Sequence, residues 1–210
     1  MKNEAWLFLI RHGATKANES RPYVLQGRNM DLPLSETGRR QAEQLGRFLA
    51  QRNIARVVSS PMKRAVETAQ AVAQPHGLTV EVCEELTECD VGRWEGMDWD
   101  SIMQQYPDEY QRFMDNPAEH GYLEGETYSD VLHRVQPALQ KIIEQAEGRP
   151  TVVVAHNVVN RAYLSTLLGI ELRKAKSIPQ NNTGVNVIRQ RDGELKLLTL
   201  NAVFHLDELP

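Results

Sequence analysis

The chain has 210 residues, of which 41% are hydrophobic and 25% are charged, a composition typical of a soluble globular protein with one buried core. Its formal net charge of -4 argues against a nucleic-acid-binding protein that acts through bulk electrostatics. The two cysteines, Cys83 and Cys89, are too few for a disulfide framework or a zinc pattern and favour a reduced, cytoplasmic compartment. The apolar run over 5–10 is too short for a signal peptide or a membrane span, so we expect no membrane partner. We find no repeat or linker, which predicts a single domain over residues 1–210.

The N-terminal part of the chain predicts a strand followed by a helix. Residues 5–10 are an apolar run typical of a buried strand. Ser35 precedes an amphipathic pattern over 36–50 and is expected to cap that helix. The residues expected on the inner face of the helix are Ala42, Leu45, Phe48 and Leu49.

A second strand and a second helix follow. Residues 56–59 predict a short strand, and Ser60-Pro61 predicts the next helix start, with serine as the cap and proline in the first helical position. Residues 78–83 predict a further strand. The apolar stripe expected along the second helix consists of Met62, Ala65, Val66, Ala69, Val72 and Ala73.

The alternation of strands and helices resumes after a less regular stretch over 93–126. A long helix is predicted over 127–147, and Pro137 inside it predicts a kink or a break. Residues 151–155 are the clearest buried strand, and a helix is expected to follow as far as Gly169. The inward residues of the long helix are expected to be Val131, Leu132, Val135, Leu139 and Ile142.

The chain ends with a strong hairpin signal. Residues 184–190 and 194–200 flank Asp192-Gly193, a dipeptide favoured in tight turns between antiparallel strands. Strands that alternate with helices, followed by a terminal hairpin, predict an α/β fold. We expect a three-layer α/β/α sandwich with a mostly parallel central sheet.

Reactive side chains directly follow the first predicted strand. Arg11 can hold phosphate oxygens with two parallel hydrogen bonds, and Gly13 lets the backbone approach an anion. His12 can act as a nucleophile near neutral pH, because the ordinary pKa of histidine lies close by. The triplet alone is weak, since a strand end with a surface arginine and a capping histidine has the same pattern.

Two further groups fall beside predicted strand ends. Arg64 lies in the first turn of the second helix, and His156 directly follows the strand over 151–155. Because parallel strands gather their carboxyl ends at one edge of a sheet, we expect both to converge with Arg11 and His12. Alone, Arg64 is typical of a solvated helix residue and His156 of a helix cap, so their joint placement carries the hypothesis of a phosphate site. The histidines with expected structural roles are His76, His120, His133 and His205.

Short sequence blocks recur in a characteristic order along the chain. The first blocks are Leu9-Ile10-Arg11-His12-Gly13-Ala14-Thr15 with Asn18, Gln26-Gly27, the stretch from Asp31 to Gly38, and Ser59-Ser60-Pro61 with Arg64, Glu67 and Thr68-Ala69. The later blocks are Leu86-Thr87-Glu88 with Gly92, Trp94, Glu95 and Gly96, Gly125-Glu126-Thr127, the strand that ends in His156, and Leu200-Asn201 with His205-Leu206. Over nearly its whole length the chain resembles the histidine phosphatase superfamily, in its phosphoglycerate-mutase-like branch, as a phosphatase-type member.

The resemblance implies a metal-independent phosphatase without a cofactor, which hydrolyses a small-molecule phosphomonoester through a phosphohistidine intermediate on His12. Arg11, Arg64 and His156 would hold the phosphate oxygens and neutralise charge in the transition state. The nearby cations should lower the pKa of His12 and keep it unprotonated. Glu88, identified by the family spacing to Gly92 and Trp94, would be the general acid and base. The residues expected to contact the substrate are Thr15, Asn18, Gln26, Gly27 and Asn157.

Two departures bear on the substrate. Asn157 stands where the family usually has glycine, and it either crowds the oxygen site or adds a donor. A variable cap segment, residues 94–128, lacks the extra basic residues of the mutases, which favours a phosphatase. The segment holds seven of the 13 aromatic residues, nine carboxylates and one strong base, Arg112. We favour a cap with aromatics packed inward and acids in water over a lid that contacts the substrate. An acidic lid would disfavour a second phosphate and select a neutral, cationic or aromatic leaving group.

Two other functions stay open. One is a cofactor-dependent phosphoglycerate mutase, which needs a bisphosphate to keep His12 phosphorylated. The other is a non-catalytic phosphate-binding regulatory module on the same fold. The expected partner is a small phosphorylated substrate, and the terminal hairpin leaves a homodimer open through its sheet edge.

Overall fold

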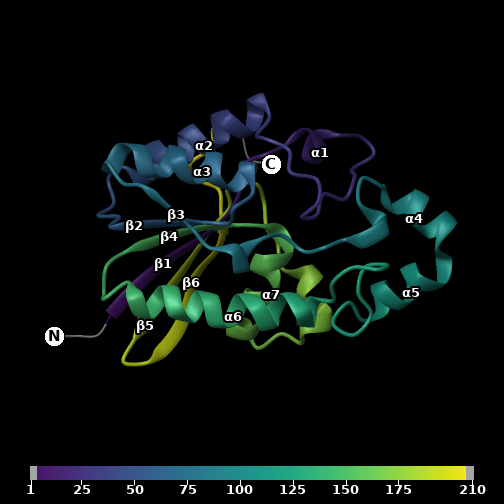
Figure 1. The fold of residues 1–210 in the computed structure, drawn as a ribbon. Coiled ribbons are helices and arrows are strands. Elements are labelled where there is room, and N and C mark those ends of the chain that lie inside the picture. The colour runs from purple at the N-terminus through teal and green to yellow at the C-terminus, as the bar shows by residue number, and fades with distance from the viewer. Residues whose placement is uncertain (1–3, 207–210) are drawn as a thin grey trace.

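The computed structural model describes residues 4–206 and contains a six-stranded sheet with helices on both faces (Figure 1). The strand order is β3-β2-β4-β1-β5-β6. The strands are β1 (Glu4–Arg11), β2 (Arg56–Ser59), β3 (Val80–Val82), β4 (Thr151–Ala155), β5 (Val185–Arg191) and β6 (Glu194–Ala202). The first four pair in parallel, whereas β5 pairs antiparallel with both β1 and β6. The mostly parallel central sheet predicted by the sequence is therefore confirmed.

Helices connect the strands and form the outer layers. The α-helices are α1 (Lys16–Glu19), α2 (Glu36–Leu49), α3 (Lys63–Ala73), α4 (Trp99–Gln105), α5 (Pro107–Asp115), α6 (Tyr128–Gln145) and α7 (Asn157–Leu168). The short 3-10 helices are η1 (Gln74–His76), η2 (Glu84–Leu86), η3 (Gly92–Trp94) and η4 (Leu172–Ser177). Figure 1 shows α2 and α3 over one face of the sheet and α6 and α7 over the other. This arrangement is the three-layer α/β/α sandwich expected from the alternating pattern.

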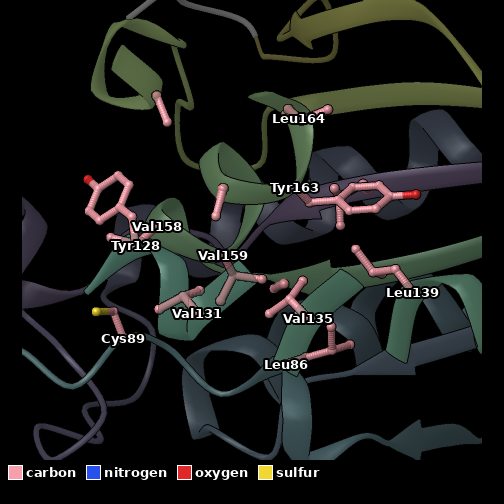
Figure 2. Packing of buried hydrophobic residues seen from close by; sticks show 14 of the residues in the cluster. Leu86, Cys89, Tyr128, Val131, Val135, Leu139, Val158, Val159, Tyr163 and Leu164 are labelled. Atoms are coloured by element: carbon pink, nitrogen blue, oxygen red, sulfur yellow. The ribbon is translucent and has the colours of Figure 1, made fainter. Parts of the chain in front are cut away.

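Alternating side chains of the central strands build a separate hydrophobic cluster on each face. Val152 of β4 packs with residues of α2 and α3, whereas the next residue, Val153, packs with residues of α6 and α7. Figure 2 shows Val131 and Val135 of α6 beside Val159 of α7. Because both faces of β4 are covered, all five of its residues are buried, which explains its unbroken apolar sequence.

The C-terminal hairpin has the turn that its sequence predicts. Asp192 and Gly193 both have positive φ angles, 52° and 85°. A two-residue turn of this kind needs left-handed backbone at both positions, which aspartate tolerates and glycine adopts freely. β5 and β6 consequently pair along most of their length at the antiparallel side of the sheet.

Ser60-Pro61 does not start a helix, and this prediction is wrong. α3 begins at Lys63, with Met62 as its N-cap residue and no side-chain cap. The Ser60 hydroxyl instead lies 2.7 Å from Nε2 of His156, and the Ser60 amide donates to the carbonyl of Val154. The serine is therefore held by β4 and the residue that follows it rather than by its own helix.

The break that Pro137 allowed and the expected position of Phe48 are also wrong. The α6 helix runs unbroken from Tyr128 to Gln145 with the proline inside it, and the alternative of a kink stays a prediction. A proline in a helix interior costs about 3 kcal/mol, and the burial of neighbouring residues such as Leu139 against the sheet outweighs that cost. Phe48 is 43% exposed, although it was expected on the inner face of α2. The remaining expected core residues of α2 are buried, namely Ala42, Leu45 and Leu49.

The cap segment, residues 94–128, contains α4 and α5, which lie beyond the carboxyl ends of the parallel strands (Figure 1). Its aromatic residues pack inward, as expected. The Phe113 ring lies 5.5 Å from the ring of Trp94 and 4.5 Å from the ring of Tyr122, and all three residues are buried. The acidic residues of the cap that lie on its exposed surface include Asp108 and Asp115.

Within residues 4–206, no helix is both long enough and apolar enough to span a membrane. Cys83 and Cys89 are both free thiols. The cytoplasmic location and the homodimer stay predictions.

We expect Leu139→Ala to destabilise the fold by about 2–5 kcal/mol, because the leucine is fully buried between α6 and the sheet and its truncation leaves a cavity. Urea unfolding of the variant would measure the loss in the free energy of unfolding. Leu198→Ala is the matched control, since Leu198 is 41% exposed on β6 and should change that free energy by less than about 0.5 kcal/mol. Equal losses in the two variants would contradict the assigned core.

Candidate active site

The register of β1 against β4 brings two histidines together. Arg11, the last residue of β1, pairs with Ala155, the last residue of β4. His12 and His156 follow directly, and the His12 amide donates to the Ala155 carbonyl at 3.0 Å. The two imidazole rings have centroids 5.1 Å apart, and both side chains are buried. The convergence of strand ends that the sequence predicts therefore exists for this pair.

The protonation state of His12 follows from its contacts. Its Nδ1 lies 2.7 Å from the carbonyl oxygen of Gly13. A carbonyl oxygen can only accept, so Nδ1 carries the proton and Nε2 keeps a free lone pair in the neutral ring. Burial, followed by the charges of Arg64 and Arg11, lowers the pKa of His12 well below its ordinary value of 6.5. The arrangement therefore leaves a neutral imidazole with a nucleophilic nitrogen.

Backbone carbonyls hold the two arginines in place. Arg64 is completely buried, and its two terminal nitrogens donate to the carbonyls of Met30 and Gly27, each at 3.1 Å. Arg11 donates through Nη1 to the carbonyl of Gln180 at 2.7 Å. Neither guanidinium has a carboxylate within ion-pair distance among residues 4–206. Both positive charges are therefore left to act on whatever enters the site.

Unpartnered buried polar atoms gather around His12. Nε of Arg11, Nε of Arg64 and Nδ1 of His156 are all buried without a hydrogen-bond partner in the structure. Buried polar atoms are nearly always paired, so a group of them next to two guanidinium groups without an ion-pair partner is suited to an anion. Burial, with the charges of Arg64 and of nearby His12 and Arg11, also lowers the pKa of His156 well below its ordinary value. The site is consequently suited to an oxyanion such as phosphate.

The Glu88 side chain lies at the N-terminus of α7. Its carboxylate accepts from the backbone amides of Cys89 at 2.9 Å, Asn157 at 3.0 Å and Val158 at 3.4 Å. The free amides and positive dipole at a helix N-terminus favour a carboxylate in this position. The side chain is buried and lines the same small cavity as His12.

The residues expected to contact the substrate have different positions. Asn18, Gln26 and Asn157 line the cavity of about 30 Å³ that also contains Arg11, His12 and Glu88. The Thr15 hydroxyl donates to Oε1 of Gln26 at 2.7 Å, so it positions that side chain. Gly27 contributes the carbonyl that Arg64 donates to. Three of the five residues therefore line the cavity, whereas Thr15 and Gly27 contact other residues of the site.

A larger cavity of about 280 Å³ adjoins the first and shares Arg11, Tyr23 and Asn157 with it. Its charged lining residues are Arg11, Arg161 and Lys176, and none of the carboxylates of the cap segment lines it. The carboxylates of the cap segment therefore do not supply the charge that lines this cavity. Those on the exposed surface of the cap include Asp108 and Asp115, whereas Glu95 and Glu126 are half-buried and contact other residues near the site.

Sequence reasoning missed Arg134 among the residues that hold this site in shape, and it named Glu95 and Glu126 only as members of the family blocks. Arg134 of α6 pairs with Glu126 and donates to the carbonyls of Thr87 and Glu88, which fixes the segment that carries the carboxylate. Glu95 accepts from the amide of Gly27 at 2.6 Å and so orients the loop against Arg64. Apart from the Arg134–Glu126 ion pair, their partners are backbone groups far away in the sequence, and no local pattern signals such contacts.

Comparison with known proteins agrees with this geometry. The model of the histidine phosphatase superfamily (branch 1) matches residues 7–203. Phosphoserine phosphatase 1 of Hydrogenobacter thermophilus is 33% identical over 202 residues, which cover 96% of this chain and 94% of that protein. Phosphoglycerate mutase-like protein 4 of Arabidopsis thaliana is 34% identical over 208 residues, which cover 97% and 88%.

Solved structures are similar over the same length. YhfR of Bacillus stearothermophilus has a TM-score of 0.88 and 32% identity, covering 96% of this chain and 98% of that one. A mutant phosphoserine phosphatase of Entamoeba histolytica in complex with phosphoserine has a TM-score of 0.84 and 26% identity, covering 96% and 99%. The comparisons confirm the enzyme class that the sequence predicts, a phosphoric monoester hydrolase. The chain belongs to the histidine phosphatase superfamily (branch 1).

Proposed function

We propose that this protein is a metal-independent phosphatase that hydrolyses a small-molecule phosphomonoester through a phosphohistidine intermediate on His12. The observation that carries the proposal is the cluster of buried, unpartnered donors on Arg11, Arg64 and His156 around a neutral His12 with a free Nε2. Two guanidinium groups can neutralise the phosphoryl oxygens as a metal ion does in other phosphotransfer enzymes.

In the first step, Nε2 of His12 attacks phosphorus and forms the P–N bond. The ester P–O bond breaks, and the carboxylic acid form of Glu88 gives its proton to the leaving oxygen. Arg11 and Arg64 neutralise the negative charge on the transferring group. The hydrogen bond from Nδ1 to the Gly13 carbonyl stabilises the positive charge that the His12 ring gains.

In the second step, the Glu88 carboxylate takes a proton from water while the water oxygen attacks phosphorus. The P–N bond breaks, inorganic phosphate leaves, and His12 regains its neutral ring. Glu88 is then protonated again and ready for the next substrate. Its three backbone hydrogen bonds hold the side chain in one position for both proton transfers.

His156 serves as an oxygen ligand in this scheme. The Ser60 hydroxyl accepts from the amide of Met62 at 3.4 Å and has its own proton available for Nε2 of His156. That arrangement leaves the proton of His156 on Nδ1, the buried atom without a partner, which can donate to a phosphate oxygen. Asn18, Gln26 and Asn157 supply further polar groups around the phosphate. The Thr15 hydroxyl positions Gln26, and the Gly27 carbonyl accepts from Arg64.

His12→Ala should lower the rate of phosphate release from phosphomonoesters, measured in the presence of a chelator, by about a thousandfold or more. The reason is that no other group forms the intermediate. The measurement is inorganic phosphate released from a panel that includes O-phosphoserine and 3-phosphoglycerate. His133→Ala is the matched control, since His133 is exposed on α6.

Each alternative gives a different result in that assay. Isomerisation of phosphoglycerate without net phosphate release would indicate a mutase. Phosphate binding without turnover of any ester would indicate a regulatory module. Activity that the chelator removes, or that survives in His12→Ala, would contradict the proposed mechanism.

Glu88→Gln should lower kcat for an alkyl phosphomonoester by about 10²–10⁴-fold, because the leaving alkoxide then lacks a proton donor. The loss in the rate of the first step should be smaller for p-nitrophenyl phosphate, whose leaving group needs little protonation. Single-turnover kinetics measure this step separately. Glu84→Gln, an exposed neighbour on η2, is the control. Equal losses for the two esters would argue against general acid catalysis by Glu88.

The pH dependence follows from the lowered pKa of His12. A histidine with a lowered pKa stays neutral as the pH falls through 6.5, and it loses its nucleophilic lone pair only at lower pH. After correction for the fraction of substrate dianion, the loss of kcat/KM that protonation of His12 causes should be centred well below pH 6.5. An acidic limb centred at or above pH 6.5 would show that the imidazole is not held neutral as the structure indicates.

A further inference from the structure

The larger cavity, of about 280 Å³, extends from the phosphate site toward the cap segment. Its walls are mostly apolar or aromatic and include Trp99, Tyr122 and Tyr128. Because it adjoins the cavity that contains His12 and Glu88, it is the space open to the part of the ester beyond the scissile oxygen. The polar groups in this cavity therefore select the leaving group.

Arg161 of α7 presents a positive charge to this cavity. Its Nε donates to the carbonyl of Ile178 at 2.8 Å, which anchors the side chain and leaves the terminal nitrogens without a described partner. No carboxylate lies within ion-pair distance of the Arg161 guanidinium among residues 4–206. The guanidinium thus has its hydrogen-bonding fork free in a half-buried position.

Lys176 of η4 adds a second cation to the same cavity. Its Nζ lies 4.7 Å from the centre of the Phe113 ring and 3.1 Å from the sulfur of Met114, so soft and aromatic groups surround the ammonium. Burial and then the charge of Arg161 lower the pKa of Lys176, whereas the charge of Asp115 opposes the shift. Two cations that repel each other in a half-buried space are costly unless an anion joins them.

We propose that Arg161 and Lys176 form a subsite for a carboxylate on the leaving group, so that the preferred substrates are phosphomonoesters of hydroxy acids. This inference rests on the proposed function, because it assumes that the phosphate binds beside His12. The planar fork of Arg161 matches a carboxylate with two parallel hydrogen bonds. The nearby charge of Asp115 offsets part of the positive charge, which favours a monoanionic carboxylate over a phosphate dianion. The subsite replaces the expectation of a neutral or cationic leaving group.

Binding to the His12→Ala protein tests the subsite without turnover. The probes are O-phospho-L-serine and O-phosphoethanolamine, which differ only in the carboxylate, and calorimetry gives Kd for each. We expect His12→Ala to bind phosphoserine at least about tenfold more tightly. Adding Lys176→Gln or Arg161→Gln should lower this preference about tenfold, because each removes one cation from the subsite.

Two matched controls lie in the same 3-10 helix. Lys174→Gln and Arg173→Gln remove the same kinds of charge from η4, but both residues are exposed and pair with Glu171 outside the cavity. They should keep the preference for phosphoserine. If Arg161→Gln perturbs folding through its contact with Ile178, Lys176→Gln still tests the subsite, since Lys176 anchors no backbone group in the described structure.

The possible results separate the subsite from the proposed function. Equal binding of the two probes, or a preference that survives Lys176→Gln, overturns the subsite even where the wild-type enzyme hydrolyses both esters. Tighter, Lys176-dependent binding of 1,3-propanediol bisphosphate, which has no carboxylate, than of phosphoserine also overturns it, because the second anion would then be a phosphate. A carboxylate preference without phosphate release from any ester supports the subsite and overturns the phosphatase.

Discussion

The parallel pairing of β1 with β4 is the constraint on which the rest of the site depends. Because Arg11 pairs with Ala155, the next residue of each strand, His12 and His156, emerge side by side at one edge of the sheet. The register is held by the core, since Leu9 and Ile10 point to opposite faces and pack in different hydrophobic clusters. A slip by one residue would exchange those faces, so the same burial that stabilises the sheet also sets the spacing of the two imidazoles.

Positive charge is concentrated around that pair without an internal counterion. Arg11 and Arg64 are buried and anchored by backbone carbonyls rather than by carboxylates, so their charge is oriented but not neutralised. Such an arrangement is unfavourable for folding and favourable for binding an anion, because the donors need no rearrangement when phosphate arrives. Glu88 stays apart from the arginines because the amides at the start of α7 hold its carboxylate. The site therefore holds an acid and two cations without a direct ion pair between them, although burial lowers the pKa of both arginines and the charge of Glu88 opposes that shift.

The charged residues that line the larger cavity do not come from the cap segment. The composition of that segment is acidic, yet none of its carboxylates lines the adjoining cavity, whose charged lining residues are Arg11, Arg161 and Lys176. Arg161 and Lys176 come from the C-terminal part of the chain, one from α7 and one from η4. A count of charges within one segment is therefore a poor guide to the field inside a cavity, because several segments build the wall.

The sequence by itself determined the order of the elements and pointed to the residues that we propose to react. Periodicity and turn chemistry are local, which is why the strand over 56–59 and the Asp192-Gly193 turn were predicted at their observed positions, and the family blocks single out His12 and Glu88. Local signals failed at Ser60, whose partner His156 lies 96 residues away, and the break that Pro137 allowed is absent from the long helix. Only the tertiary structure decided that Arg134 holds the segment that carries Glu88, and that Arg161 and Lys176 line the larger cavity. Those contacts join distant segments through backbone carbonyls and buried faces, and no spacing along the chain encodes them.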